Sequence, residues 1–258
     1  MENFGTDLIA FLLGLIMGSF VGLCAYRIPR RKSVVFGPSR CDNCGAPLGW
    51  LHKLPLVGYL IVRGRSRCCG KPISYRYPIL EIVTGIFFVL IYRHSPESAI
   101  LFPTITFLVL VLLGMLIDLD HRIIPDKITL TGMVVGLLLA GIFSQPGLEE
   151  ALLGILICGG FLYLGGRLGE AIFSKANAMG GGDIKFAAMI GAFLGWQPGL
   201  VAVIIAAVVG TAFGLVQILT QGNSLASREL PFGPFLALGA LTSLFCSNVL
   251  LSWYFGLG

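Results

Sequence analysis

Long apolar segments separated by short polar ones make up most of this chain. The first runs from Asp7 to Tyr26, and seven more follow before the end of the sequence. Most of them approach the ~20 residues that an α-helix needs to cross a bilayer, and the shortest must borrow residues from their flanks. The pattern therefore predicts an all-α integral membrane protein with about eight transmembrane helices. The seven later segments cover residues 78–92, 98–117, 127–143, 151–173, 184–196, 198–220 and 233–255.

The composition agrees with a membrane protein, since 56% of the residues are hydrophobic and only 12% are charged. Soluble globular domains contain about twice that share of charged residues. The residues before Asp7 lack the basic region of a secretory signal, and no cleavage-like site follows the first apolar segment. We therefore expect the first segment to be a retained transmembrane helix.

Basic residues are concentrated in one segment of the chain. Eleven of the 18 Lys and Arg residues lie between residues 27 and 77. Because Lys and Arg are retained on the cytoplasmic side of membranes, this segment is predicted to face the cytoplasm. If eight helices cross the membrane and residues 27–77 are cytoplasmic, Arg93 is the only basic residue predicted on the outer side. The net charge of +5 is then explained by membrane orientation and contact with anionic lipid headgroups, and it does not indicate nucleic-acid binding.

These boundaries divide the chain into three parts. They are a first transmembrane helix (1–26), a cytoplasmic cysteine-knuckle domain (27–77) and a transmembrane core (78–258). The cytoplasmic part, with about fifty residues, is too small to bury much of a core without a disulfide or a metal ion.

Two cysteine-containing turns provide a candidate for such a metal site. Cys41 and Cys44, three positions apart and followed by Gly45, resemble a zinc-ribbon knuckle. The second turn repeats the Cys-Gly-x-Pro ending at Cys69, but Ser66 takes the place of its first cysteine. This arrangement predicts structural zinc bound by the three cysteines that are in register.

The fourth ligand position has two candidates, Cys68 and His52, although neighbouring cysteines seldom bind one ion together. The alternative is a loop with reduced, metal-free thiols, because disulfides are rare in the cytosol. The remaining cysteines lie inside apolar segments, where they are expected to act as small buried hydrophobic residues. They are Cys24, Cys158 and Cys246.

Two aspartates border the membrane on the same predicted side. Asp118 directly follows an apolar segment, and Asp183 opens another. Carboxylates at one depth on different helices can share a proton and act as acid and base in peptide hydrolysis. Each alone could equally cap a helix or contact water, and Asp126 is best explained as the N-cap of the next helix.

The segment before Asp183 contains three glycines in a row, Gly180, Gly181 and Gly182, and Lys185 follows it. A backbone without side chains lets a substrate strand approach the carboxylate closely. The alternatives for such glycines are loop flexibility and helix packing. We expect the glycines to form a catalytic loop with Lys185.

The Gly-x-Gly-Asp motif at Asp183 resembles that of the type IV prepilin peptidases, a family of aspartic membrane proteases. Further segments follow in the family's order over nearly the whole chain. They are Gly18-Ser19-Phe20, Arg27-Ile28-Pro29, the cysteine knuckles, Gly64-Arg65, Ile73 to Pro78 with Glu81, Asp118 to Asp126 and Pro231-Phe232-Gly233-Pro234.

The resemblance implies an enzyme of the bacterial cytoplasmic (inner) membrane whose active site faces the cytoplasm. Its substrate would be a type IV prepilin or a pseudopilin, cleaved after a glycine that ends a basic leader peptide. Bifunctional members then methylate the new N-terminus with S-adenosylmethionine. The catalytic pair carries over to Asp118 and Asp183; Asp120 is the near competitor, but the family's acid lies seven positions before the Ile-Pro proline.

One departure from the family pattern is Ser66, where the family has a cysteine, and it weakens the case for a tetracysteine site and for the methyltransferase. No glycine-rich S-adenosylmethionine loop is visible. Glu81 could serve methyl transfer, but we favour its pairing with a basic residue such as Arg27. Two other classes stay open: a transporter with a proton-relaying acidic pair, and a non-catalytic assembly protein.

Overall fold

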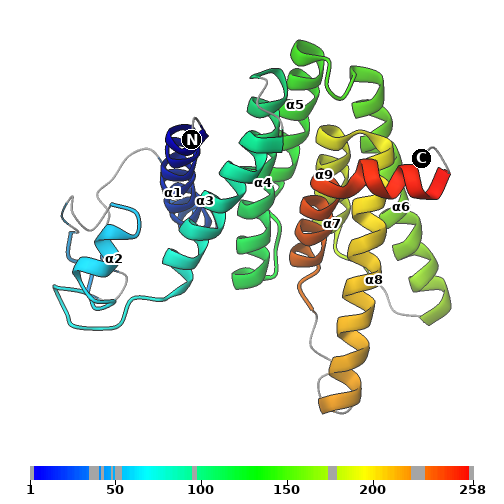
Figure 1. The fold of residues 1–258 in the computed structure, drawn as a ribbon. Coiled ribbons are helices and arrows are strands. Elements are labelled where there is room, and N and C mark those ends of the chain that lie inside the picture. The colour runs from blue at the N-terminus through cyan, green and yellow to red at the C-terminus, as the bar shows by residue number, and fades with distance from the viewer. Residues whose placement is uncertain are drawn as a thin grey trace. The chain divides into compact units, whose positions relative to one another are not determined.

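The computed structural model describes residues 3–34, 41, 44–47, 49, 54–94, 98–173, 179–221 and 230–255, and they are almost entirely helical (Figure 1). Within these ranges there is no strand, and an isolated antiparallel bridge joins Arg65 and Pro72. The helices are α1 (Asn3–Arg27), α2 (Val57–Ile61), α3 (Arg76–His94), α4 (Ser98–His121), α5 (Asp126–Phe143), α6 (Leu148–Phe173), α7 (Gly181–Leu194), α8 (Trp196–Gln221) and α9 (Gly233–Phe255).

Each of the eight predicted apolar segments forms a helix. Six helices, α1, α3, α4, α5, α6 and α8, are long and apolar enough to cross a membrane. Helix α7 has 14 residues, which span only about 21 Å at 1.5 Å per residue, less than the ~30 Å of a hydrocarbon core. The protein is therefore a multi-pass membrane protein with six such helices in its described part, and the count of eight crossings stays a prediction.

The chain forms two compact units, residues 1–97 and 98–258. In the first unit α1 packs along α3, and the cysteine turns and α2 lie in the connection between them. At one end of this pair the Arg93 guanidinium donates to both carboxylate oxygens of Asp7, at 3.2 and 2.5 Å. The one basic residue predicted on the outer side is thus neutralised by an acidic partner.

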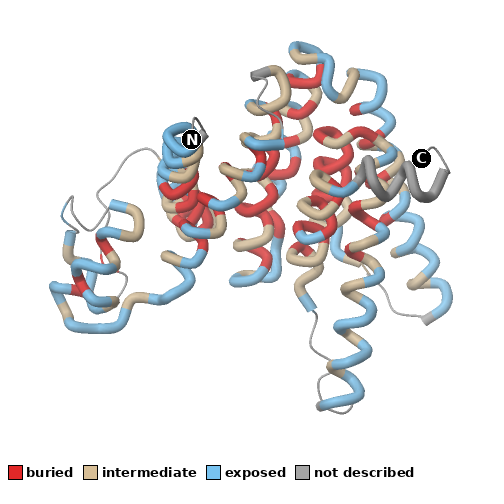
Figure 2. The backbone as a smooth tube through the Cα atoms, viewed as in Figure 1, coloured by how far each residue is buried: buried red, intermediate tan, exposed pale blue. Residues whose placement is uncertain are grey.

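The second unit is built around α7, which packs against α4, α5, α6, α8 and α9. Its residues from Phe186 to Phe193 are all buried, as the red stretches in the middle of this unit show (Figure 2). A helix that is apolar on every side is stable inside a helix bundle or in lipid, and here the surrounding helices bury it. Gly191 permits this packing, because its backbone touches the backbone of Gly154 on α6 and leaves no room for a Cβ.

One end of this unit gathers several helix termini. The last turn of α4 lies beside the first turns of α7 and α9, and α5 starts next to α7. Because the buried body of α7 fixes this arrangement, polar residues at these termini are held in place by the apolar core below them.

Candidate active site

Asp118 lies in the last turn of α4, and its side chain is buried, with only 4% of the residue exposed. Its Oδ2 atom accepts a hydrogen bond of 2.8 Å from the backbone N–H of Gly233, the first residue of α9. A buried carboxylate needs such a donor, because removing it from water without one costs several kcal/mol. Asp120, the competing acid on the same helix, is exposed.

Asp183 lies in the first turn of α7 and is partly buried. Its backbone N–H bonds to the carbonyl of Gly180 at 3.1 Å, which starts the helix just before the carboxylate. The side chain is close enough to Asp118 for the two charges to interact. The structure thus brings together the two predicted catalytic acids, which are 65 positions apart in the sequence.

The three glycines before Asp183 have different surroundings. A Cβ on Gly180 would lie 2.8 Å from the Asp183 carboxylate, and one on Gly182 would lie 3.2 Å from Cβ and 3.3 Å from the carbonyl oxygen of Ile124. Gly181 is exposed, and nothing lies within 4 Å of its Cβ position. Two of the glycines therefore serve close packing, and Gly181 is the one with open space beside it.

Lys185 forms an ion pair of 2.6 Å with Asp126, and both side chains are largely exposed. Such exposed pairs contribute about 0–1 kcal/mol, so this one mainly ties the first turns of α5 and α7 together. The expectation that Asp126 is an N-cap is wrong by one residue. Pro125 is the N-cap, with extended backbone, and Asp126 belongs to the first turn, where its charge complements the helix dipole.

The two cysteine turns have the same backbone hydrogen bonds. In the first turn Cys41 N–H bonds to the Ala46 carbonyl and Gly45 N–H to the Cys41 carbonyl, both at 2.8 Å. In the second turn Ser66 bonds to Lys71 in the same way, and Gly70 bonds to Ser66, at 2.8 and 2.7 Å. Both glycines have positive φ angles, near +70°. Ser66 therefore occupies the position that Cys41 has in the first knuckle. Likewise, Cys69 occupies the position before the glycine that Cys44 has in the first knuckle.

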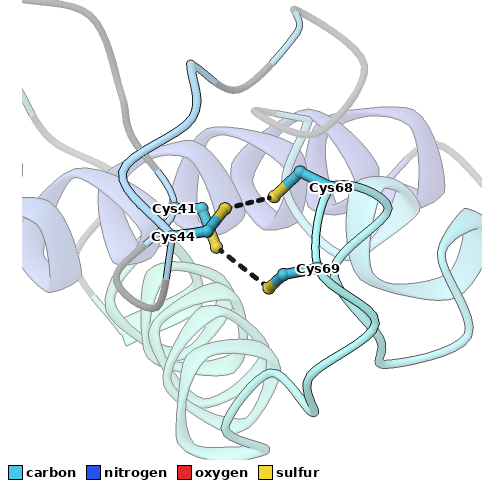
Figure 3. A group of neighbouring side chains, drawn as sticks. All are labelled: Cys41, Cys44, Cys68 and Cys69. Carbon is cyan, nitrogen blue, oxygen red and sulfur yellow. Dashed lines mark hydrogen bonds between the residues drawn. The ribbon is translucent and has the colours of Figure 1, made fainter.

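Four thiols converge between these turns (Figure 3). The sulfur atoms of Cys41, Cys44, Cys68 and Cys69 all lie within 4.8 Å of one another. A tetrahedral zinc ion with Zn–S bonds of ~2.3 Å needs sulfur atoms roughly 3.8 Å apart. Cys41 and Cys69 are 3.8 Å apart, whereas Cys44 and Cys68 are closer, at 3.0 Å. Four thiols are a donor set that zinc commonly binds. Cys68 belongs to the cluster although it is next to Cys69, whereas His52 lies outside the described residues.

Ser66 contacts this cluster without adding a sulfur. Its hydroxyl oxygen lies 3.3 Å from the sulfur of Cys41 and 3.0 Å from that of Cys68. The hydrogen bond between the Cys44 and Cys68 thiols, 3.0 Å between sulfur atoms, raises the pKa of the Cys44 thiol to about 12. A bound zinc ion would lower the pKa of this thiol, because zinc binds the deprotonated thiolate.

Glu81 is buried near the start of α3. Its Oε2 atom accepts the backbone N–H of Leu56 at 2.7 Å, and the Ser19 hydroxyl is a second partner. Arg27, which the sequence suggested as its ionic partner, donates to the carbonyl oxygen of Ser33 at 2.9 Å. Glu81 therefore anchors the chain at Leu56, directly before α2.

Comparison with known proteins bears on both units. Residues 12–95 match the bacterial peptidase A24 N-terminal domain, and residues 105–215 match the type IV leader peptidase family. A prepilin leader peptidase/N-methyltransferase of Klebsiella pneumoniae is 38% identical over 195 residues, which are 72% of this chain and 84% of the relative. The chain belongs to the type IV leader peptidase family.

Two further prepilin leader peptidase/N-methyltransferases extend this match. The Aeromonas hydrophila protein is 30% identical over 272 residues, covering 95% of this chain and 92% of its own. The Myxococcus xanthus protein is 36% identical over 216 residues, 83% of this chain, which spans 64% of that relative's length. No solved structure matches the chain.

Family membership makes this leader peptidase an enzyme of the prepilin-peptidase class and favours that class over a transporter or a non-catalytic assembly protein. Sequence reasoning did not assign the hydrogen bond from Gly233 to Asp118. The signal was present in the Pro-Phe-Gly-Pro segment, 231–234, but nothing local connects it with an acid 115 positions earlier.

Proposed function

We propose that Asp118 and Asp183 cleave the basic leader from a type IV prepilin or pseudopilin after a glycine, at the cytoplasmic membrane face. The observation that carries this proposal is that two carboxylates, from α4 and α7, lie within range of each other's charge at one end of the second unit. Both lie at the boundary between a buried helix bundle and exposed loops, where a substrate emerging from the bilayer can reach them.

In the proposed reaction the two acids share one proton, because two negative charges at short range are unfavourable in a partly buried site. The ionised carboxylate takes a proton from a water molecule, which attacks the carbonyl carbon of the scissile bond. The protonated carboxyl donates to the carbonyl oxygen. When the tetrahedral intermediate collapses, the C–N bond breaks and the amine leaves with the proton that the first carboxylate took from water. A hydroxyl proton of the intermediate returns to the other carboxylate, which restores the shared proton of the pair.

Substrate access is assigned to the open space beside Gly181. A transmembrane helix of the substrate has its backbone groups bonded internally, so the bond to be cut must first unwind into an extended strand. The exposed backbone at Gly181 offers a place where such a strand can approach within hydrogen-bond distance. Lys185, paired with Asp126, holds this turn against α5.

We further propose that the four cysteines hold one structural zinc ion, which stabilises the connection between α1 and α3. Methylation of the new N-terminus with S-adenosylmethionine is proposed because the relatives are named as N-methyltransferases as well as leader peptidases. The described residues do not identify a site for S-adenosylmethionine, so the methylation is proposed as an activity of the chain without assigned residues.

The proposed orientation places residues 27–77 in the cytoplasm of a bacterial inner membrane. A cysteine introduced at Tyr75, which is 68% exposed, should react with a membrane-impermeant maleimide only after the cells are opened. The measurement is mass-tag gel shift in whole cells and in lysates, compared with the wild type, which gives the labelling of the native thiols. Labelling in intact cells would show that the segment faces outwards.

The proposed activity is tested with purified protein and a prepilin fragment that carries its leader. Mass spectrometry of the products should show a cut after the leader's last glycine, and with S-adenosylmethionine the mature product should gain one methyl group. A pre-cleaved fragment should still be methylated by Asp118→Asn if the two activities use separate residues. An intact substrate after prolonged incubation with folded wild-type protein would overturn the peptidase assignment.

A further inference from the structure

The start of α9 contacts one of the two acids directly. The backbone N–H of Gly233 points at Asp118 Oδ2 across 2.8 Å, in a buried setting. A Cβ at Gly233 would lie 2.7 Å from that oxygen, 2.9 Å from the Cβ of Asp118 and 3.1 Å from its Cγ. Contacts with the side-chain stem cannot be relieved by rotating the carboxylate alone. The position of Asp118 therefore requires glycine here.

The neighbouring residues leave this N–H free for Asp118. The carbonyl of Phe232 accepts the N–H groups of Phe235 and Leu236, at 3.0 and 3.1 Å. Pro234 has no N–H group, and proline is well suited to the first turn of a helix. Of the N–H groups of residues 233–236, that of Gly233 is the one directed at the acid.

The turn before α9 is itself fixed from a third helix. The Phe232 ring lies against Gly210 of α8, where a Cβ would come within 3.1 Å of the ring. Phe235 packs beside Phe232, with ring centroids 6.2 Å apart, and against Phe213 of α8. The position of the Gly233 N–H is therefore set by aromatic packing on α8 and not by a mobile loop.

We propose that Gly233 is a positioning residue of the peptidase: its N–H holds Asp118 in place and stabilises the charged form of that carboxylate. The inference rests on the proposed function of Asp118 and Asp183, and it adds the turn at residues 231–234 as a third structural element of the site. Hydrogen bonds to a charged group are about twice as strong as neutral ones, so the ionisation of Asp118 should depend on this donor.

Other charged groups near Asp118 come from the elements packed against α4. Helix α7 contributes Asp183, and α5 contributes Asp126, which is paired with Lys185. On α4 itself Asp120 and His121 follow, outside the buried part of the helix. Residues 230–246 contain no charged side chain, so the described part of α9 acts on Asp118 through its backbone.

The test compares Gly233→Ala with Gly160→Ala, a glycine of α6 with nothing within 4 Å of its Cβ position. Gly233→Ala should lower kcat roughly tenfold or more with little change in KM. It should also move one or both limbs of the pH–rate profile upward by about one pH unit, because the charged form of Asp118 loses its donor. Gly160→Ala should behave as wild type. An unshifted profile for Gly233→Ala would overturn the inference.

A second measurement does not depend on activity. If the new methyl group meets Asp118, the fall in Tm caused by Gly233→Ala should be largely absent in the Asp118→Gly background, which removes the stem and the carboxylate. Two results would overturn the contact. Gly233→Ala could lower Tm equally with Asp118 present and in the Asp118→Gly background, or both Gly233→Ala and the double variant could fail to fold. If Asp118→Asn and Asp183→Asn both still cleave substrate, the proposed function itself fails, which is a separate result.

Discussion

Replacing Asp118 or Asp183 with asparagine should abolish leader cleavage, with a loss of at least about a thousandfold in kcat. Each acid performs one half of the proton transfer, and general acid–base groups contribute about 10²–10⁴-fold each. Asparagine is nearly isosteric and can still accept the Gly233 N–H, so the fold should survive. Cleavage is measured on a leader-bearing prepilin fragment, and folding is checked by thermal unfolding.

The matched control for these variants is Asp120→Asn. Asp120 is two positions from Asp118 on the same helix but exposed, so its substitution should leave substantial activity. An inactive Asp120→Asn beside an active Asp118→Asn would show that the wrong carboxylate of α4 was assigned. The pH–rate profile of the wild type should be bell-shaped, because the pair is inactive when both acids are protonated and when both are ionised.

Loss of any of the four clustered thiols should release the metal and loosen the connection between α1 and α3. Elemental analysis of the wild type should find about one zinc per chain, since the four sulfur atoms converge within 4.8 Å. Cys41→Ser, Cys69→Ser and Cys68→Ser should each retain far less zinc. In so small a module the free energy of metal binding is folding free energy, so these variants should also be cleaved faster by protease in this segment.

Cys68→Ser decides how this chain completes its metal site, because serine takes the usual cysteine position at residue 66. Cys246→Ser, an exposed cysteine of α9 remote in sequence from the knuckles, is the control and should keep its zinc. Full zinc content in Cys68→Ser would show that another group, such as His52, is the fourth ligand. If the wild-type protein is fully active but contains no zinc, the proposal of a structural zinc ion is wrong.

The sequence was sufficient to place the helices because a run of apolar residues long enough for a membrane has few other stable conformations. It was less informative about α7. Its apolar run, 184–196, is short for a membrane span, and the structure shows a 14-residue helix enclosed by five others. Whether a short apolar helix crosses lipid or fills the centre of a bundle depends on its neighbours, which local sequence does not describe.

The candidate site shows the same division between local and tertiary information. Asp118 and Asp183 could be proposed from their places at segment ends, and the structure brings them together. The hydrogen bond from the Gly233 N–H could not be proposed from the sequence, since its acceptor, Asp118, is 115 positions away. Cys68 could be named only as one of two candidates for the fourth ligand, because the paired turns that bring the four thiols together are a tertiary feature.

The central claim is that Asp118 and Asp183 act as one catalytic unit, and the most direct test is the double variant. Single-turnover cleavage rates are measured for wild type, for Asp118→Asn, for Asp183→Asn and for the two substitutions combined. Because neither acid works without the other, the double variant should be no slower than either single variant. A double variant slower by the product of the two single losses, or a single variant that keeps near-wild-type cleavage, would contradict the account.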